Sequence, residues 1–493
     1  MSPVTDRRDP SRSTAGAAAD PRDSDAGLAT DELVEMTAGT ALVGSSRRVL
    51  GGAVDSRLVE PGNVFVALPG ERTDGHRFVG AALDRGAAAV LVTRPPAEAD
   101  LTAARDQGAA IVLVPDALAA LQAVAAAWRL RFDPLVVGIT GSIAKTSTKE
   151  AVATVLSAAI PTLKNEGNLN NEVGLPLTVL RLRSEHRAAV LEMGMYVGGE
   201  IADLARIGRP EIGVVTAVQA VHLSRIGTLD AVAKAKGELV EALPDDGVAV
   251  LNADDDRVRA MATRTGARVV TYGFAADADV RAEAVVSRGV DGMTFTLLAG
   301  GDRTSVEIPV LGRLAVHNAL AAAAVGLAAG LPSETVGAAL ATGWSAPHRG
   351  QLVHAGGVTI VDDSYNASPG SVVAALELLA GIPGRRIAVL GTMLELGDDH
   401  ESGHRSVGAA AATVVDHLVV VGDDASSIAE GARSAGLRDG VITSVADRAT
   451  ARDRLLEIAR PGDVMLVKAS RGIALDLLVD DLVAALGGTE ARP

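Results

Sequence analysis

The chain has 493 residues, of which 48% are hydrophobic and 22% charged, and a prior of about 150 residues per domain suggests about three domains. Its net charge of −15 argues against a general binder of nucleic acids, so an acidic ligand would need local Lys and Arg side chains. Because there is no cysteine, disulfides, thiolate zinc sites and cysteine nucleophiles are excluded.

Two segments indicate where in the cell we expect the protein. Residues 1–27 are rich in Asp, Arg, Ser and Ala and lack the apolar core of a signal peptide, so we expect a disordered tail. The most apolar later stretch, 314–331, is mostly alanine and contains His317 and Asn318, which favours a buried helix over a membrane span. We therefore expect a cytoplasmic protein with no integral membrane segment.

Short Val, Ile and Leu runs alternate with Ala-rich helical stretches along the chain, which is typical of parallel sheets covered by helices. Strand-like segments, a helix and another strand fill 54–92, and a second helix is expected at 117–130. An antiparallel appendage is expected at 280–309, a helix at 315–330 and a linker at 344–349. Further strands are expected at 135–139, 188–191, 212–216, 247–251, 269–272, 358–361, 386–390, 417–421 and 464–467.

Residues 138–146, Gly-Ile-Thr-Gly-Ser-Ile-Ala-Lys-Thr, separate an apolar strand from a helical stretch at 145–158. Small residues let backbone N–H groups converge on phosphate oxygens, Lys145 adds a cation, and Thr146 offers a hydroxyl group to magnesium. The alternative is an ordinary glycine-rich turn. The candidate ATP-binding residues of the loop are Gly141, Ser142, Ile143, Ala144, Lys145, Thr146 and Ser147.

The phosphate loop departs from the strict spacing at Ile139 and at Ala144, where glycines are usual. At Ala144 the added methyl group costs little if this residue has helical backbone angles, but about 1 to 2 kcal/mol if it must be left-handed. We therefore expect Ala144 to be right-handed and Ala144→Gly to change ATP affinity modestly.

Polar residues follow several predicted strands, where open α/β sheets place their ligands. Glu192 emerges directly from a buried strand, and His222 comes a few residues after another. With Thr146 they could converge on magnesium beside bound phosphates. The alternatives are a strand-end acid in a salt bridge and a loop histidine with ordinary partners.

Three further stretches are candidate ligand-binding segments. Residues 165–176 contain Asn168, Asn170 and Asn171, whose amides suit a ligand-lining loop, although a solvated turn is the alternative. Polar bursts at 362–366 and 468–472 end two strands of the last third. Lys236, in Ala-Lys-Ala-Lys-Gly-Glu, has a plainer interpretation as part of an exposed helix face.

Together these motifs resemble the Mur ligases, and within that family the MurF group, which adds D-alanyl-D-alanine to a UDP-muramoyl tripeptide. The distinguishing stretch is Asp-Asp-Ser-Tyr-Asn-Ala-Ser-Pro at 362–369, similar to the MurF pattern Asp-Asp-Ser-Tyr-Asn-Ala-Asn-Pro. Further matches are Asp-Ser-Arg at 55–57, Asp-Gly-His at 74–76, Gly-Thr-Met-Leu-Glu-Leu-Gly at 391–397, and the segment 468–472. The match runs in order from about residue 54 to about residue 472.

The resemblance implies an α/β protein of three-domain Mur ligase architecture, with a UDP-substrate-binding domain at 28–116, a central P-loop domain with a parallel sheet at 117–345, and a C-terminal Rossmann-like ligase domain at 346–493. The implied cofactors are ATP and magnesium, the substrates are UDP-N-acetylmuramoyl-tripeptide and D-alanyl-D-alanine, and a monomer is expected. The implied metal ligands are Thr146, Glu192, His222 and a carbamylated Lys236. The residues implied to contact the nucleotide are Asn318, Arg349 and Asp363, and those implied to contact the UDP moiety are Ser56 and Arg57. The residues implied to contact the substrates are Asn168, Asn170, Asn171, Asn366, Lys468 and Arg471. The residues implied to serve catalysis are Lys145, Glu192, His222 and Lys236.

Several departures from the family pattern surround the phosphates, metal and adenine. Besides Ala144, they are Tyr196-Val197 for Asn-His, Ala217-Val218-Gln219 for Asn-Ile-Gly, Leu314-Ala315 for His-Asn, and Ala469 for Gly. Three hypotheses therefore stand: an active MurF-type ligase, a ligase of the same fold for a different amino acid or dipeptide, and a catalytically weak paralogue that binds nucleotide or muropeptide. Whether the third peptide residue is lysine or diaminopimelate is left open.

Overall fold

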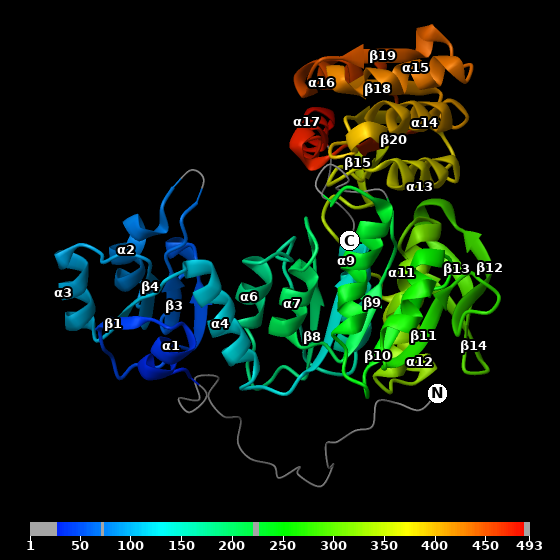
Figure 1. The fold of residues 1–493 in the computed structure, drawn as a ribbon. Coiled ribbons are helices and arrows are strands. Elements are labelled where there is room, and N and C mark those ends of the chain that lie inside the picture. The colour runs from blue at the N-terminus through cyan, green and yellow to red at the C-terminus, as the bar shows by residue number, and fades with distance from the viewer. Residues whose placement is uncertain (1–26, 71–72, 220–225, 488–493) are drawn as a thin grey trace.

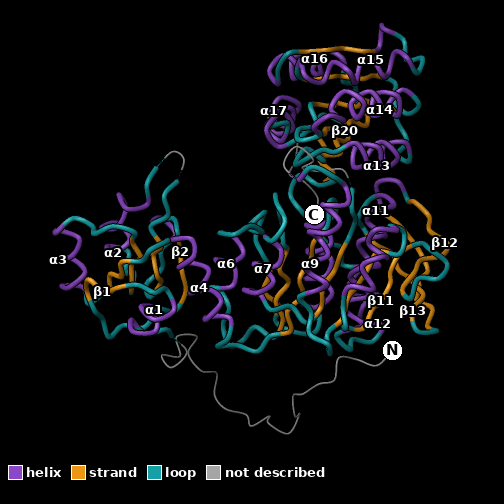
Figure 2. Tube along the Cα trace, viewed as in Figure 1, coloured by secondary structure: helices purple, strands orange, loops and turns teal. Residues whose placement is uncertain are grey.

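The computed structural model describes residues 27–70, 73–219 and 226–487, which form three β-sheets that follow one another along the chain, each covered by helices (Figures 1 and 2). The first module lies beside the central one, and the C-terminal module stacks on the central one (Figure 1). Of the predicted tail, all but Gly27 lies outside the described residues. The domain boundaries predicted after 116 and 345 fall between sheets and stay predictions.

The N-terminal sheet has five strands in the order β1-β5-β4-β3-β2, parallel except for β1. Four-residue apolar runs form its buried strands, as the fully buried Asn-Val-Phe-Val of β3 illustrates. The elements are α1 Thr30–Met36, β1 Thr40–Val43, β2 Gly51–Ala53, β3 Asn63–Val66, α2 Val79–Asp84, β4 Ala89–Val92, α3 Glu98–Gln107, β5 Ala110–Leu113 and α4 Ala117–Arg129.

Helix α4 joins the first module to the second. One continuous hydrophobic core runs from the N-terminal sheet through α4 to one face of the central sheet. Trp128 lies in this core, and its indole N–H donates to the carbonyl of Leu182 at 3.2 Å. Helix α4 therefore belongs to the packing of both modules.

The central sheet has nine strands in the order β14-β13-β12-β11-β10-β9-β6-β8-β7. The strands from β7 to β12 are parallel, and β13 and β14 add an antiparallel edge, which confirms the antiparallel appendage. The strands are β6 Leu135–Thr140, β7 Thr162–Lys164, β8 Ala188–Glu192, β9 Ile212–Val215, β10 Val248–Asn252, β11 Arg268–Gly273, β12 Val280–Ser287, β13 Met293–Ala299 and β14 Asp302–Ile308.

Helices cover both faces of the central sheet, which explains why its parallel strands are continuous apolar runs. The alanine-rich α11 is buried along most of its length and shares a core with α5. The helices are α5 Lys145–Ser157, α6 Gly174–Val179, α7 Glu200–Gly208, α9 Leu229–Glu241, α10 Asp256–Arg259, α11 Gly312–Ala328 and α12 Ser333–Ala341. In the part of the chain that the structure describes, no helix is long and apolar enough to cross a membrane.

The C-terminal sheet has six strands in the order β15-β16-β20-β17-β18-β19, parallel except for β15. Helices α13 to α15 pack on one face and α16 and α17 on the other. The elements are β15 Gln351–Ala355, β16 Val358–Asp362, α13 Pro369–Ala380, β17 Arg385–Gly391, α14 His400–Ala412, β18 His417–Val421, α15 Ser426–Ser434, β19 Ile442–Val445, α16 Arg448–Ile458, β20 Asp463–Lys468 and α17 Asp476–Leu486.

Candidate functional site

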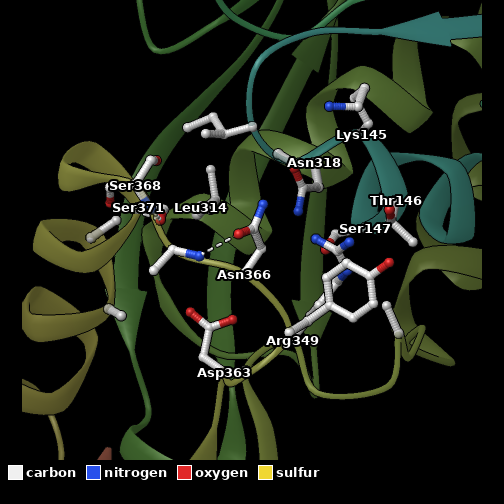
Figure 3. Close-up of a pocket in the computed structure, with 18 of the residues that line it drawn as sticks. Lys145, Thr146, Ser147, Leu314, Asn318, Arg349, Asp363, Asn366, Ser368 and Ser371 are labelled. Atoms are coloured by element: carbon white, nitrogen blue, oxygen red, sulfur yellow. Dashed lines mark hydrogen bonds between the residues drawn. The ribbon is translucent and has the colours of Figure 1, made fainter. Parts of the chain in front are cut away.

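A cavity of about 970 Å³ lies where the C-terminal module meets the carboxyl ends of the central strands (Figure 3). The phosphate loop and the start of α11 supply one part of its wall, and the strand ends of the C-terminal module supply another. Most of the predicted site residues line this cavity, namely Ser142, Ile143, Ala144, Lys145, Thr146, Ser147, Asn168, Asn170, Asn171, Glu192, Lys236, Asn318, Arg349, Asp363, Asn366, Lys468 and Arg471.

The phosphate loop joins β6 to α5 and is tied to the end of β9. The Ser142 N–H donates to the carbonyl of Ala217 at 2.8 Å, and the Thr216 hydroxyl donates to the carbonyl of Ile143 at 2.6 Å. Gly141 has φ +150°, and a Cβ there would come within 1.8 Å of the Thr216 hydroxyl oxygen. Only glycine fits this position, so the loop's path past β9 explains that residue.

Ala144 is left-handed, with φ 64° and ψ 0°, so the prediction of a right-handed Ala144 is wrong. It is the N-cap residue of α5, and the chain must turn sharply there to bring the loop into the helix. Its carbonyl accepts from the Thr148 N–H at 2.8 Å and thus begins the helix. The turn requires this backbone shape even though a methyl group is present.

Ala144→Gly is expected to leave stability unchanged or to raise it by up to about 1.5 kcal/mol. Removing the methyl group relieves about 1 to 2 kcal/mol of left-handed strain, and the greater freedom of glycine in the unfolded chain offsets about 0.5 to 1 kcal/mol. Urea unfolding measures the balance, and calorimetry with ADP tests the modest change expected in nucleotide affinity. A loss of more than about 1 kcal/mol would contradict the strain argument.

Lys145 points its amine into the phosphate loop. The ammonium donates to the carbonyl of Gly141 at 2.7 Å and to that of Ser142 at 3.4 Å. Burial lowers the pKa of Lys145, the charge of Glu192 acts in the opposite direction, and that of Arg349 lowers the pKa further. Lys145 and Arg349 therefore bring two cationic side chains to the same part of the cavity, beside Glu192.

Glu192 ends β8 and is 1% exposed. Its Oε2 accepts from the Thr146 hydroxyl at 2.9 Å, and its Oε1 accepts from the Asn170 amide at 2.7 Å. No salt bridge to Glu192 is found within the described ranges, so the salt-bridge alternative is not supported there. The two oxygens instead hold the phosphate loop and the asparagine loop, residues 165–171, side by side.

The three predicted asparagines of this loop make different hydrogen bonds. The Asn171 side-chain oxygen accepts from the N–H of Gly174 at 2.8 Å and so orders the start of α6. The Asn168 carbonyl accepts from the Asn170 N–H at 2.7 Å. Of the three, Asn170 is therefore the one bonded directly to the carboxylate of Glu192.

Lys236 lies on α9 and is 2% exposed, so the exposed-face interpretation is wrong. Burial lowers the pKa of Lys236 well below its ordinary value, and the positive charge of Lys145 lowers it further. The amine is therefore neutral far more often than that of a surface lysine. A neutral amine is the form that reacts with carbon dioxide.

His222 lies outside the described residues, so its predicted place beside Thr146 and Glu192 stays a prediction. Among the described residues, no group of three or more His, Asp or Glu side chains is placed to hold a metal ion. Thr146 and Glu192 nevertheless present oxygen atoms to the cavity, and oxygen is the ligand atom that magnesium prefers.

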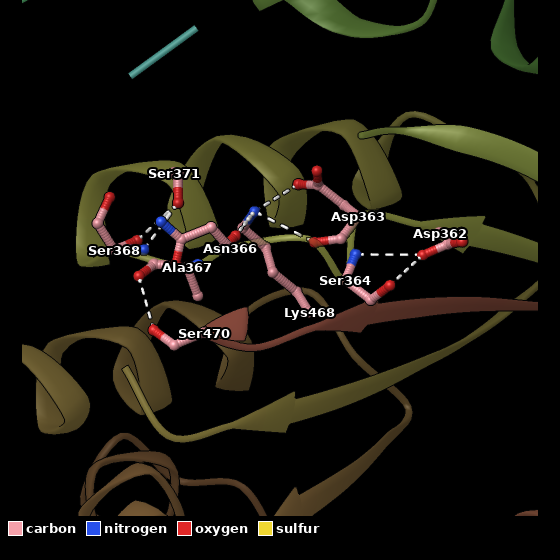
Figure 4. Close-up of polar contacts among 9 residues, drawn as sticks. All are labelled: Asp362, Asp363, Ser364, Asn366, Ala367, Ser368, Ser371, Lys468 and Ser470. Carbon is pink, nitrogen blue, oxygen red and sulfur yellow. Dashed lines mark hydrogen bonds and ion pairs between the residues drawn. The ribbon is translucent and has the colours of Figure 1, made fainter. Parts of the chain in front are cut away.

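The opposite wall of the cavity is built from the ends of β16 and β20 (Figure 4). Lys468 is 3% exposed, and its amine donates to the Asp363 carboxylate at 2.6 Å and to the carbonyl of Asn366 at 2.9 Å. These contacts fix the polar turn that follows β16. The side-chain oxygen of Asn366 accepts from the Ala367 N–H at 2.9 Å.

Tyr365 is a residue of this wall that the sequence analysis did not select as a site residue. The Arg349 guanidinium lies 4.1 Å from the centre of its ring, that of Arg471 lies 5.1 Å away, and an Arg471 N–H donates to the Tyr365 hydroxyl at 2.7 Å. The ring therefore holds two predicted cations against the cavity. The rarity of tyrosine could have pointed to this residue, because the chain has only three tyrosines.

Ser56 and Arg57 lie in a short helical turn of the N-terminal module and are not among the residues lining the cavity. Ser56 is buried, and the exposed Arg57 pairs with Asp55 at 2.6 Å. Asn318 does line the cavity, where its side-chain oxygen accepts from the Thr148 hydroxyl at 3.2 Å.

His404 supports the cavity-lining loop that follows β17. Its Nε2 accepts from the Met393 N–H at 2.9 Å, and its Nδ1–H donates to the carbonyl of His400 at 2.6 Å. This arrangement requires the neutral ring. Burial lowers the pKa of His404, so the folded protein binds a proton there less readily than the unfolded chain.

Neutral His404 is therefore expected to stabilise the fold above the unfolded pKa of about 6.5, and this contribution is lost as the pH falls below that value. Urea unfolding at a series of pH values measures the effect. His404→Gln can keep one donor and one acceptor but does not titrate, so its stability should fall less steeply between about pH 6.5 and pH 5. Equal slopes in the two proteins would argue against the role of His404.

Three family models match the chain: "Mur ligase family, catalytic domain" at residues 51–129, "Mur ligase middle domain" at 139–326, and "Mur ligase, glutamate ligase domain" at 348–471. The sequence is similar to the UDP-N-acetylmuramoyl-tripeptide–D-alanyl-D-alanine ligase of Mycobacterium tuberculosis, with 40% identity over 477 residues, 89% of this chain and 93% of the relative.

Two solved structures are similar to the fold described above. MurF from Acinetobacter baumannii has a TM-score of 0.83 and 30% identity, with 93% of this chain and 99% of that chain covered. The MurF ligase from Thermotoga maritima in complex with ADP has a TM-score of 0.78 and 28% identity, with 89% of this chain and 98% of that chain covered.

Proposed function

Because the chain belongs to the Mur ligase family, we propose that it adds D-alanyl-D-alanine to UDP-N-acetylmuramoyl-tripeptide with ATP, in the synthesis of peptidoglycan precursors. The observation that carries this proposal is that the phosphate loop and the Asp-Asp-Ser-Tyr-Asn strand end of the C-terminal module line one cavity. A site between two modules can bring a nucleotide and an acceptor together and then exclude water.

The phosphate loop binds the ATP phosphates through its backbone N–H groups at the start of α5. In the nucleotide-bound state, the Lys145 ammonium exchanges its contacts with the loop carbonyls for phosphate oxygens. Arg349 and Arg471 bring further positive charge from the C-terminal wall. Support for ATP as the nucleotide comes from the Thermotoga maritima relative in complex with ADP.

Magnesium fits the oxygen atoms of Thr146 and Glu192, with His222 and Lys236 as the further proposed ligands. Lys236 would coordinate as its carbamate, which a buried amine with a lowered pKa is suited to form. When bound, magnesium supplies positive charge to the phosphate oxygens and lowers the barrier to phosphoryl transfer. Asn170 and the Thr146 hydroxyl hold the Glu192 carboxylate in place for this role.

The terminal carboxylate of the tripeptide attacks the γ-phosphate in line, the bond between the γ-phosphate and ADP breaks, and an acyl phosphate forms. Lys145 and the arginines stabilise the negative charge of the transferring group, which is the main task in such a reaction. The amine of D-alanyl-D-alanine then attacks the acyl carbon. Inorganic phosphate leaves, and the nitrogen loses a proton as the amide forms.

Binding of the two substrates extends beyond the phosphates. Ser56 and Arg57 are proposed to contact the UDP moiety from the N-terminal module. Asn168, Asn171, Asn318 and Asp363 are proposed to line the bound nucleotide and peptide, with Asn366 and Lys468 on the acceptor side. We further propose that the enzyme is a monomer. We propose that it works in the cytoplasm, because ATP and UDP-linked precursors are found there.

Phosphate release from ATP tests the proposal against its alternatives. Release should require UDP-N-acetylmuramoyl-tripeptide and D-alanyl-D-alanine together, with single amino acids and glutamate at least about 10²-fold slower as acceptors. A faster rate with one of those acceptors would identify a ligase of different specificity. ATP binding without release in any combination would identify a catalytically weak paralogue.

A further inference from the structure

Lys149 is a fully buried lysine on α5 that has no part in the proposed binding of nucleotide or substrate. Its amine lies 3.0 Å from Glu150 Oε1 and donates to the carbonyls of Asn165 at 2.8 Å and Gly167 at 3.4 Å. A charge this deep in a protein is costly unless it is paired and hydrogen-bonded. The groups that the Lys149 amine contacts therefore indicate its role.

Two of those partners are backbone carbonyls of the asparagine loop. Asn165 in this loop is 0% exposed, and its side-chain oxygen accepts from the backbone N–H of Glu192 at 2.6 Å. Five residues later, the Asn170 amide donates to the Glu192 carboxylate at 2.7 Å. The loop thus holds both the main chain and the side chain of Glu192.

Lys149 follows Thr146 by three residues, so the two side chains lie on the same face of α5. Thr146 donates to Glu192 directly, and Lys149 fixes the loop that holds Glu192 from the other side. The contacts therefore form a closed ring from α5 through Glu192 and the asparagine loop back to α5.

We propose that Lys149 is a positioning residue, which anchors the asparagine loop to α5 and so fixes the Glu192 carboxylate for magnesium and nucleotide. This role rests on the proposed function of Glu192. A purely structural ion pair would need only Glu150, whereas Lys149 also binds two carbonyls of the loop that grips Glu192. Loss of the amine would loosen the asparagine loop that holds the carboxylate, without removing any group proposed to touch the substrates.

Lys149→Met is expected to lower the magnesium affinity measured in ATP binding by about 10- to 100-fold, the usual effect of losing a partner of a metal ligand. Turnover should fall with it, while the KM for D-alanyl-D-alanine stays the same. Lys164→Met is the matched control, because the half-exposed Lys164 pairs with the other oxygen of Glu150 and has no hydrogen bond to the asparagine loop. We expect wild-type magnesium dependence in the control.

Lys149→Met leaves the mostly buried Glu150 carboxylate with Lys164 as its remaining ion-pair partner, so the double variant Lys149→Met/Glu150→Met is the second test. It removes both buried groups and keeps an apolar interior, which proteins tolerate well. The same magnesium defect in a folded double variant supports the proposal, and wild-type magnesium dependence in either folded variant overturns it. Wild-type protein that binds magnesium and ATP but forms no amide would refute the ligase function and leave the role of Lys149 testable by calorimetry.

Discussion

The Lys145→Met variant is expected to release phosphate at least about 10³-fold more slowly than the wild type, the scale on which a cation at a transferring phosphoryl group acts. The side chain keeps its length and apolar stem but loses the charge that faces the phosphates. Steady-state phosphate release with both substrates measures turnover. Calorimetry with ADP measures whether the variant still binds nucleotide.

Lys234→Met serves as the control for this experiment, because Lys234 is exposed and does not line the cavity. It should behave as the wild type. A Lys145→Met protein that keeps its fold and more than about a tenth of wild-type turnover would show that the phosphates lie elsewhere.

Lys236→Met is expected to lower kcat by about 10²- to 10³-fold, because the variant cannot form the carbamate proposed to hold magnesium. Carbon-13 NMR after exposure to labelled bicarbonate gives a second measurement. A carbamate signal should appear in the wild type, since the lowered pKa of Lys236 favours the neutral amine that reacts with carbon dioxide. The signal should be absent from the variant.

Lys234→Met is the matched control here too, since it lies two residues away on the same helix and points to solvent. It should keep both the carbamate signal and the activity. If wild-type protein with full activity shows no carbamate, Lys236 acts in another way, and the proposed ligand set is wrong.

The buried strands of the fold were predictable because they are short apolar runs. β18 was predicted at its observed bounds, 417–421, and α4 ends one residue before its predicted end. Strands β1, β2, β5, β7, β15 and β19 were missed, and all of them except the buried β5 lie at sheet edges. An edge strand such as Ile-Thr-Ser-Val of β19 is partly exposed, so it does not need the apolar run that identifies a buried strand.

The lining of the cavity was predictable where a polar residue is tied to a strand end or to the phosphate loop. Glu192, Asp363 and Lys468 could be selected because polar side chains directly follow apolar strands. The left-handed backbone conformation of Ala144 could not be predicted from the sequence. Alanine generally prefers right-handed angles, and only the path of the loop into α5 overrides this preference. The burial of Lys236 was also hidden, since spacing alone fits an exposed face equally well.

The most direct test follows the oxygen atoms of the tripeptide carboxylate. The protein is incubated with ATP, D-alanyl-D-alanine and UDP-N-acetylmuramoyl-tripeptide carrying oxygen-18 in its terminal carboxylate, and the products are weighed by mass spectrometry. Attack of that carboxylate on the γ-phosphate predicts the amide product together with inorganic phosphate that contains one labelled oxygen. Amide with unlabelled phosphate, or phosphate without any amide, would contradict the account.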